Sequence, residues 1–282
     1  MLAVALALAA AACWGVADFT AGLKTRRLPV ALVLLVVQGV GCLWVLAVVV
    51  ATGEPAPDAT SAAASVLAGV AGAAALGALY RALAIGTMGV VAPISATGVA
   101  LPVVVGVATG DRLSLVVSVG LALAVAGVLL ASREQHDDAE RASAGRLSIL
   151  LALAAATGFG TYFVLADQAA DASVLWLLLL ARLVVVPVLA VLVLAGAGRR
   201  RSPLRRDDAA GLAVAGTLDV GATALFALAT TRGALSIVAV VGALYPVATV
   251  LLARVLLNER LQPAQVAGVA AAFAGVALIV AG

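Results

Sequence analysis

The sequence predicts an all-α protein that crosses a membrane ten times, as two five-helix repeats in inverted orientation. Hydrophobic residues make up 65% of the 282 residues and charged residues only 11%, whereas a soluble domain is about half apolar and a quarter charged. The apolar residues fall in blocks of about 20, the length with which a helix crosses a bilayer. A soluble chain of this size would need a charged surface that these residues do not provide, so we expect a polytopic membrane protein.

Charged residues, prolines and glycines divide the apolar blocks into ten expected spans. Helices are expected because only helices and closed barrels satisfy the backbone in lipid, and the alternation of barrel strands is absent. The first block resembles a signal peptide but lacks a basic start, so it is interpreted as a span. The spans are expected at 2–22, 30–51, 62–82, 88–109, 114–131, 147–167, 173–195, 209–229, 233–254 and 263–281.

The chain matches itself when it is shifted by 144 residues. Because alanine and leucine are abundant in this composition, they often match by chance, and only the rarer residue types are informative. They are Phe19 on Phe163, Gly72 on Gly216, Gly77 on Gly221, Gly89 on Gly233 and Pro102 on Pro246. These matches predict a first repeat at 1–131, a connecting loop at 132–146 and a second repeat at 147–282. Chance alignment of low-complexity helices is the alternative interpretation.

The odd number of spans in each repeat has a geometric consequence. After five crossings, the second copy enters the membrane from the opposite side, so the two repeats are related by an axis in the membrane plane. Many secondary transporters have this inverted design and bind their substrate at the midplane, between the repeats.

Basic residues are concentrated in the loops that follow odd-numbered spans. The positive-inside rule places these loops in the cytoplasm and therefore both termini outside the cell. The opposite face carries only Arg112 and Arg232. The residues of the basic loops are Lys24, Arg26, Arg27, Arg81, Arg133, Arg141, Arg146, Arg199, Arg200, Arg201, Arg205, Arg206, Arg254 and Arg260.

Short motifs in both halves resemble a known family. "CWG" (13–15), Pro102 followed by "GDRL" (110–113), and Pro246 followed by "NERL" (258–261) look like the two repeats of EamA-type transporters, in the drug/metabolite transporter superfamily. The resemblance covers essentially the whole chain. It implies a multi-pass protein of the plasma membrane that moves a small metabolite, more often outward, with a proton or sodium gradient as the candidate driving force.

The sequence departs from the family pattern in the second span. Family members often carry an arginine there, whereas this chain has Gln38, and an arginine stands at the corresponding position of the second repeat, Arg182. The resemblance therefore implies an asymmetric central site. Family members are also usually drawn with both termini in the cytoplasm, which is opposite to the orientation that the loop charges predict.

Two charged residues lie inside the second repeat's spans, Arg182 in span seven and Asp219 in span eight. An ionisable residue at the centre of a membrane helix costs about 2.5–3.5 kcal/mol on insertion scales, so each needs a partner or a wet cavity. One interpretation is a buried structural ion pair. In the other, Arg182 attracts a carboxylate or phosphate, Asp219 exchanges a proton or binds a cation, and Thr223 lies on the same helix face.

Other polar residues in spans are candidates for the same site. Trp14 and Asp18 share one helix face, and Tyr162 stands at the position that repeats Asp18. Asp18 either lines the cavity or lies at the interface and pairs with the basic residues of the following loop. Tyr245 and Gln38 complete the candidate set. Tyr80, beside Arg81, is interpreted as an interfacial aromatic residue.

Prolines inside two spans are candidate hinges. Pro93 and Pro102 lie in span four and Pro246 in span nine. A proline frees a backbone carbonyl and permits a kink, and interruptions at matching positions of two repeats indicate a site or hinge.

The sequence gives little support to other classes of function. Its one histidine, His136, lies in a charged loop, so no metal site, cofactor or histidine-based catalysis is expected, and the protein is not expected to be an enzyme. Nothing indicates nucleic-acid binding. We expect a secondary transporter of a small metabolite in the lipid bilayer, with an intramembrane enzyme, channel or sensor as the alternative, and with oligomeric state and coupling ion open.

Overall fold

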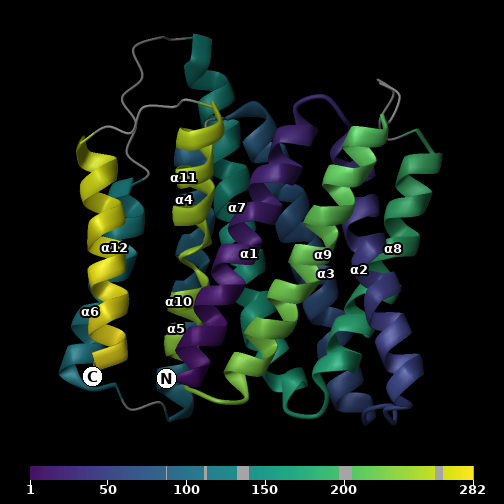
Figure 1. The fold of residues 1–282 in the computed structure, drawn as a ribbon, viewed down its shortest axis with the longest axis horizontal. Helices are drawn as coiled ribbons and strands as arrows, with labels where there is room; N and C mark the ends of the chain where they lie inside the picture. Colours follow the sequence, from purple (N-terminus) through teal and green to yellow (C-terminus); the bar gives the residue numbers. More distant parts are fainter. Residues whose placement is uncertain (87, 111–112, 132–139, 197–204, 258–262, 282) are drawn as a thin grey trace.

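A computed structural model describes residues 1–86, 88–110, 113–131, 140–196, 205–257 and 263–281 of the chain. These residues form helices joined by short connections (Figure 1). The helices are α1 (Leu2–Thr25), α2 (Val30–Thr52), α3 (Ala59–Ile85), α4 (Met88–Ala96), the 3-10 helix η1 (Thr97–Val99), α5 (Ala100–Thr109), α6 (Leu115–Ala131), α7 (Glu140–Ala170), α8 (Val174–Leu194), α9 (Arg206–Thr230), α10 (Leu235–Gly242), α11 (Tyr245–Leu257) and α12 (Pro263–Ala281).

The predicted all-α architecture is confirmed, since every expected span coincides with a helix or with a helix pair. Six helices of the described chain are long and apolar enough to cross a membrane: α1, α2, α3, residues 146–170 of α7, α8 and α9. Shorter apolar helices cover Ile94–Thr109, Leu115–Gly127 and Leu235–Thr249. The predicted connecting loop is shorter than expected, because α7 already begins at Glu140, and its residues 132–139 lie outside the described chain.

Helices of the first half pack mainly on helices of the second half. Helix α1 packs on α9, α3 packs on α7, and α2 packs on α8. Helices α6 and α12 pair at one edge of the bundle, on the left in Figure 1. Both termini lie at the same edge of the bundle, the lower one in Figure 1, where α1 begins, whereas α7 begins at the upper edge.

Spans four and nine are both interrupted. The first breaks at η1, between α4 and α5, and the second breaks at Ala243 and Leu244, between α10 and α11. The 144-residue shift places Val99 on Ala243, so the interruptions lie at matching positions. Pro102 and Pro246 stand in the first turns of α5 and α11. In a first turn the backbone N–H groups have no partner within the helix, so a proline there costs no helical hydrogen bond.

Polar contacts join the two halves at opposite ends of the bundle. At the end of α1, Lys24 Nζ and Arg27 Nη2 each lie 2.8 Å from Asp208 Oδ1, at the start of α9. At the other end, the Trp176 indole of α8 donates to the Glu54 carbonyl at 3.1 Å, and Ser173 hydrogen-bonds to the Glu54 carboxylate. The two halves are therefore held together at both ends of the bundle.

A glycine permits the close approach of α3 and α8. A Cβ atom at Gly69 would overlap the backbone of Ala181, so only glycine allows these two helix backbones to touch. Small residues commonly serve this purpose in membrane bundles, where helices associate by packing and not by the hydrophobic effect.

We predict that Gly69→Ala destabilises the bundle, because α3 and α8 must separate to accept the added methyl group. Overpacking of this kind costs ~1–3 kcal/mol, which should appear as a lower thermal unfolding temperature of the purified protein. Gly77→Ala, in the same helix, is the control: its Cβ would make an ordinary 3.7 Å contact with Leu34, and alanine favours a helix by ~1 kcal/mol over glycine. Equal melting temperatures for the two variants would contradict the close crossing.

Candidate functional site

A cavity of about 70 Å³ lies between the two halves of the bundle. Helices α1, α2 and α3 contribute lining residues from the first half, and α7, α8, α9 and α11 contribute them from the second; α6 and α12 contribute none. All eight candidate residues from the sequence line this one cavity: Trp14, Asp18, Gln38, Tyr162, Arg182, Asp219, Thr223 and Tyr245. Their functional roles remain predictions.

Arg182 and Asp219 form a buried ion pair across α8 and α9. Arg182 Nη2 lies 3.0 Å from Asp219 Oδ2, and Nη1 donates to the Leu178 carbonyl at 3.2 Å. Each residue is only 5% exposed. A guanidinium has five N–H donors, and these two bonds leave part of that capacity unused, including the buried Nε–H, which has no partner among the described residues. The guanidinium therefore keeps unused hydrogen-bonding capacity inside the bundle.

Gly41 of α2 makes room for the Arg182 side chain. A Cβ atom at this position would lie 2.7 Å from Arg182 Nε and 3.3 Å from Val220 Cβ. The contact explains why a glycine stands within α2 opposite the ion pair. Gly39, two residues earlier, has nothing within 4 Å of the same added atom.

The interfacial interpretation of Tyr80 is wrong, and so is the pairing of Asp18 with the loop that follows it. Tyr80 is fully buried and its hydroxyl donates to Asp18 Oδ1 at 3.3 Å. Helix α1 continues to Thr25, so Asp18 lies almost two turns inside the helix and only 6% of it is exposed. The basic residues Lys24 and Arg27 pair with Asp208 instead.

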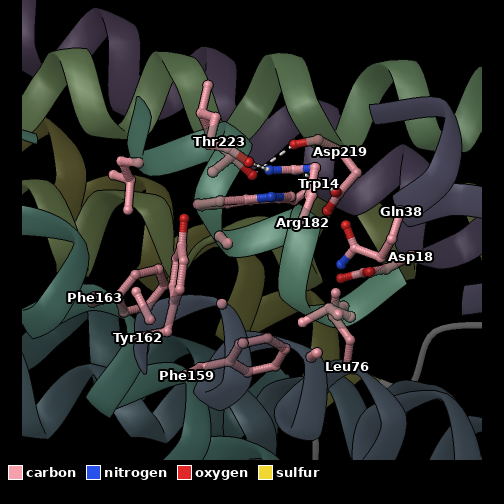
Figure 2. Close-up of a pocket in the computed structure, with 18 of the residues that line it drawn as sticks. Trp14, Asp18, Gln38, Leu76, Phe159, Tyr162, Phe163, Arg182, Asp219 and Thr223 are labelled. Carbon is pink, nitrogen blue, oxygen red and sulfur yellow. Dashed lines mark hydrogen bonds and ion pairs between the residues drawn. The ribbon is translucent and has the colours of Figure 1, made fainter. Parts of the chain in front are cut away.

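Two further polar groups face the cavity without a partner in the described chain. Gln38 Oε1 is buried and unbonded. The Tyr162 hydroxyl is also buried and points towards Thr223 in Figure 2, but it makes no hydrogen bond of normal geometry. The Thr223 hydroxyl instead donates to the Asp219 carbonyl of its own helix at 2.8 Å. Unsatisfied buried polar atoms are rare in folded proteins, so a site containing two of them is suited to a polar ligand.

Aromatic side chains build the rest of the cavity wall. Trp14 lies against Phe226 and Phe163, with ring centroids 5.5 and 6.0 Å away, and the two phenylalanines stack at 4.6 Å. Figure 2 shows Phe159 and Leu76 across the cavity from Arg182 and Asp219. The cavity therefore has a charged wall and an apolar one, which suits a small amphipathic ligand.

The Tyr245 hydroxyl is occupied by a bond between the two interrupted spans. It hydrogen-bonds to Ser95 of α4, and Ser95 also donates to the Ala92 carbonyl at 2.6 Å. Both residues stand beside the breaks at η1 and at residues 243–244. The Tyr245 ring lines the cavity while its hydroxyl joins the elements that carry the candidate hinges.

We predict that Gly41→Ala acts through the ion pair. The added methyl group displaces Arg182 from Asp219, and breaking a buried pair costs ~3–5 kcal/mol because the remaining charge is stranded. A double-mutant cycle on thermal unfolding checks this: Gly41→Ala and Asp219→Asn should be strongly non-additive, since residues in one network couple.

Gly39→Ala combined with Asp219→Asn is the control for this cycle, because its added atom meets open space. Its effect should simply add to that of Asp219→Asn. If the Gly41→Ala cycle is also additive, the glycine does not serve to accommodate Arg182.

Three comparisons with known proteins bear on this geometry. The sequence model of the EamA-like transporter family matches residues 146–281, which is the predicted second repeat. Among solved structures, a chain described only as "Crystal structure of protein" superposes with a TM-score of 0.75 over 98% of this chain and 95% of its own length, at 18% identity; it shares the fold. A comparison with curated proteins gives no match.

Proposed function

Because the chain is a member of the EamA-like transporter family, which its residues 146–281 match, we propose that it moves a small metabolite across the plasma membrane by alternating access at the central cavity. One observation carries the proposal. The three charged candidates inside spans, Asp18, Arg182 and Asp219, line a single cavity between the two halves. In a bilayer, intramembrane ionisable residues mark substrate and ion pathways.

The packing of the helices supports two repeats in inverted orientation. The two repeats pair α1 with α7, α2 with α8, α3 with α9 and α6 with α12. If every helix is replaced by its counterpart, the α1–α9 contact becomes the α7–α3 contact, and both contacts exist. The α2–α8 and α6–α12 contacts convert into themselves. The matching interruptions and the opposite starting edges of α1 and α7 (Figure 1) agree with a two-fold axis in the membrane plane.

The cavity favours a small amphipathic molecule with a carboxylate or phosphate group. Such a group competes with Asp219 for the Arg182 guanidinium, whose planar fork matches these anions. The Tyr162 hydroxyl and Gln38 Oε1 supply further hydrogen bonds to the bound molecule, while Trp14, Phe159 and Phe163 cover its apolar part. Binding and orientation are the tasks of these residues.

Alternating access requires the two halves to move about the cavity. The interruptions beside Pro93, Pro102 and Pro246 supply the hinges, since a helix break concentrates the change of backbone angles in few residues. We propose outward transport, with the face that carries Lys24 and Arg27 in the cytoplasm and both termini outside, as the loop charges indicate.

The test compares metabolites inside and outside cells that express the wild type, Asp219→Asn or Tyr162→Phe at matched membrane levels. We expect at least one anionic compound to leave wild-type cells and to be retained by both variants. Asp219→Asn leaves the buried Arg182 charge without its counter-charge and lowers stability. Tyr162→Phe removes a hydroxyl that makes no hydrogen bond of normal geometry within the described chain and should change stability little.

Gly39→Ala is the matched control and should export like the wild type. Transport of the same compound at the same rate by wild type and Tyr162→Phe would place the binding site elsewhere. Profiles of wild-type cells identical to those of cells without the protein, in hosts of differing metabolism, would argue against outward transport.

A further inference from the structure

The cavity contains more acid than it can neutralise with its own basic residues. Of the lining residues, Asp18 and Asp219 are acids and Arg182 is the basic residue. The guanidinium is bound to Asp219 at 3.0 Å. If both acids were ionised, the cavity would carry one uncompensated negative charge inside the membrane, where such a charge is costly.

Asp18 has no cationic partner in the part of the chain that the structure describes. Its contact is with the Tyr80 hydroxyl of α3, at 3.3 Å. The nearest basic residue on its own helix, Lys24, is bound to Asp208. A neutral hydroxyl donor solvates a carboxyl group but supplies no charge.

The helices that pack on α1 do not supply the missing charge either. Helix α9 presents Asp219, another acid; α2 presents the Gln38 amide; and α11 presents Tyr245, whose hydroxyl is bound to Ser95. Helix α10 carries no titratable side chain. Across the cavity, α7 presents Tyr162 and α8 presents Arg182, which Asp219 already holds.

We propose that Asp18 carries a removable proton and that this residue, not Asp219, is the proton-coupling group of the transport cycle. The neutral carboxyl takes its proton from water on one side of the membrane, when the cavity is open to that side, and releases it on the other. Asp219 stays ionised and holds the Arg182 guanidinium in place until the substrate anion replaces it. The coupling role rests on the proposed transport function, whereas the protonated state of Asp18 does not.

The two sites influence each other through charge. With Asp18 neutral, the ion pair leaves the cavity without net charge, so an anion meets an available guanidinium. With Asp18 ionised, the second negative charge opposes the anion at short range and low dielectric. The proton and the substrate anion therefore favour each other's binding, a reciprocal coupling of two sites.

The proposal is tested by infrared spectroscopy of the purified full-length protein in lipid bilayers, without any substrate. A protonated carboxyl group absorbs apart from carboxylates and shifts in heavy water. We expect wild type at neutral pH to show a protonated-carboxyl band that disappears in Asp18→Asn and persists in Asp219→Asn. Tyr80→Phe, which removes the hydrogen bond to the carboxyl oxygen, should move the band to higher frequency.

Two results would overturn the proposal: no protonated-carboxyl band in wild type at neutral pH, or a band that survives Asp18→Asn. A band that disappears only in Asp219→Asn would assign the proton to the ion pair instead. Should Asp219→Asn fail to accumulate, the loss in Asp18→Asn and the shift in Tyr80→Phe still decide the assignment.

A second measurement separates the two acids by stability. Asparagine resembles a protonated aspartate in shape and charge, so Asp18→Asn should unfold at the same temperature as wild type at neutral pH. A clear drop for Asp18→Asn would indicate an ionised carboxylate and contradict the proposal. Because neither readout uses a substrate, a negative metabolite comparison with a positive infrared result would reject transport and retain the proton site.

Discussion

The structure depends on one constraint: inside a bilayer, a charge must find its counter-charge within the protein. The buried Arg182–Asp219 pair meets this requirement, and much of the surrounding architecture accommodates it. Both side chains face the cavity between the two halves, and the pair requires Gly41 on α2, where any side chain would displace the guanidinium. Large hydrophobic residues such as Leu43 and Val191 are exposed on the outer surface of the bundle.

The positions of the helices could be predicted from the sequence, because hydropathy and length determine where a chain crosses a bilayer. The expected spans coincide with helices, and the expected interruptions of spans four and nine coincide with η1 and with residues 243–244. Candidate site residues could be chosen in the same way, since polar side chains are scarce within spans and costly there. The structure brings these residues to one cavity, but it does not test what they do.

Contacts between distant spans could not be predicted. The spans expected at 2–22 and 62–82 end three residues before α1 and α3 do, and this difference made Asp18 and Tyr80 look interfacial. The partner of Lys24 is Asp208, which lies beyond six intervening spans. No local signal specifies such pairings, because helix rotation and depth are set by packing against neighbours. The missing partners of Gln38 and Tyr162 likewise become visible only when every neighbour is in place.

The contacts at the two ends of the bundle differ in kind, and this difference affects the conformational equilibrium of the protein without substrate. Two cations hold Asp208 at the end of α1, whereas hydrogen bonds from Ser173 and Trp176 hold Glu54 at the opposite end. In the proposed transport cycle, a motion that opens the cavity at either end would have to break the contacts there, so unlike interactions would set the populations of the two open forms. Dissolved ions weaken the charged contacts more than the neutral ones. If the proposed alternating access holds, ionic strength at one membrane surface is a thermodynamic variable that biases which side of the membrane the empty cavity faces.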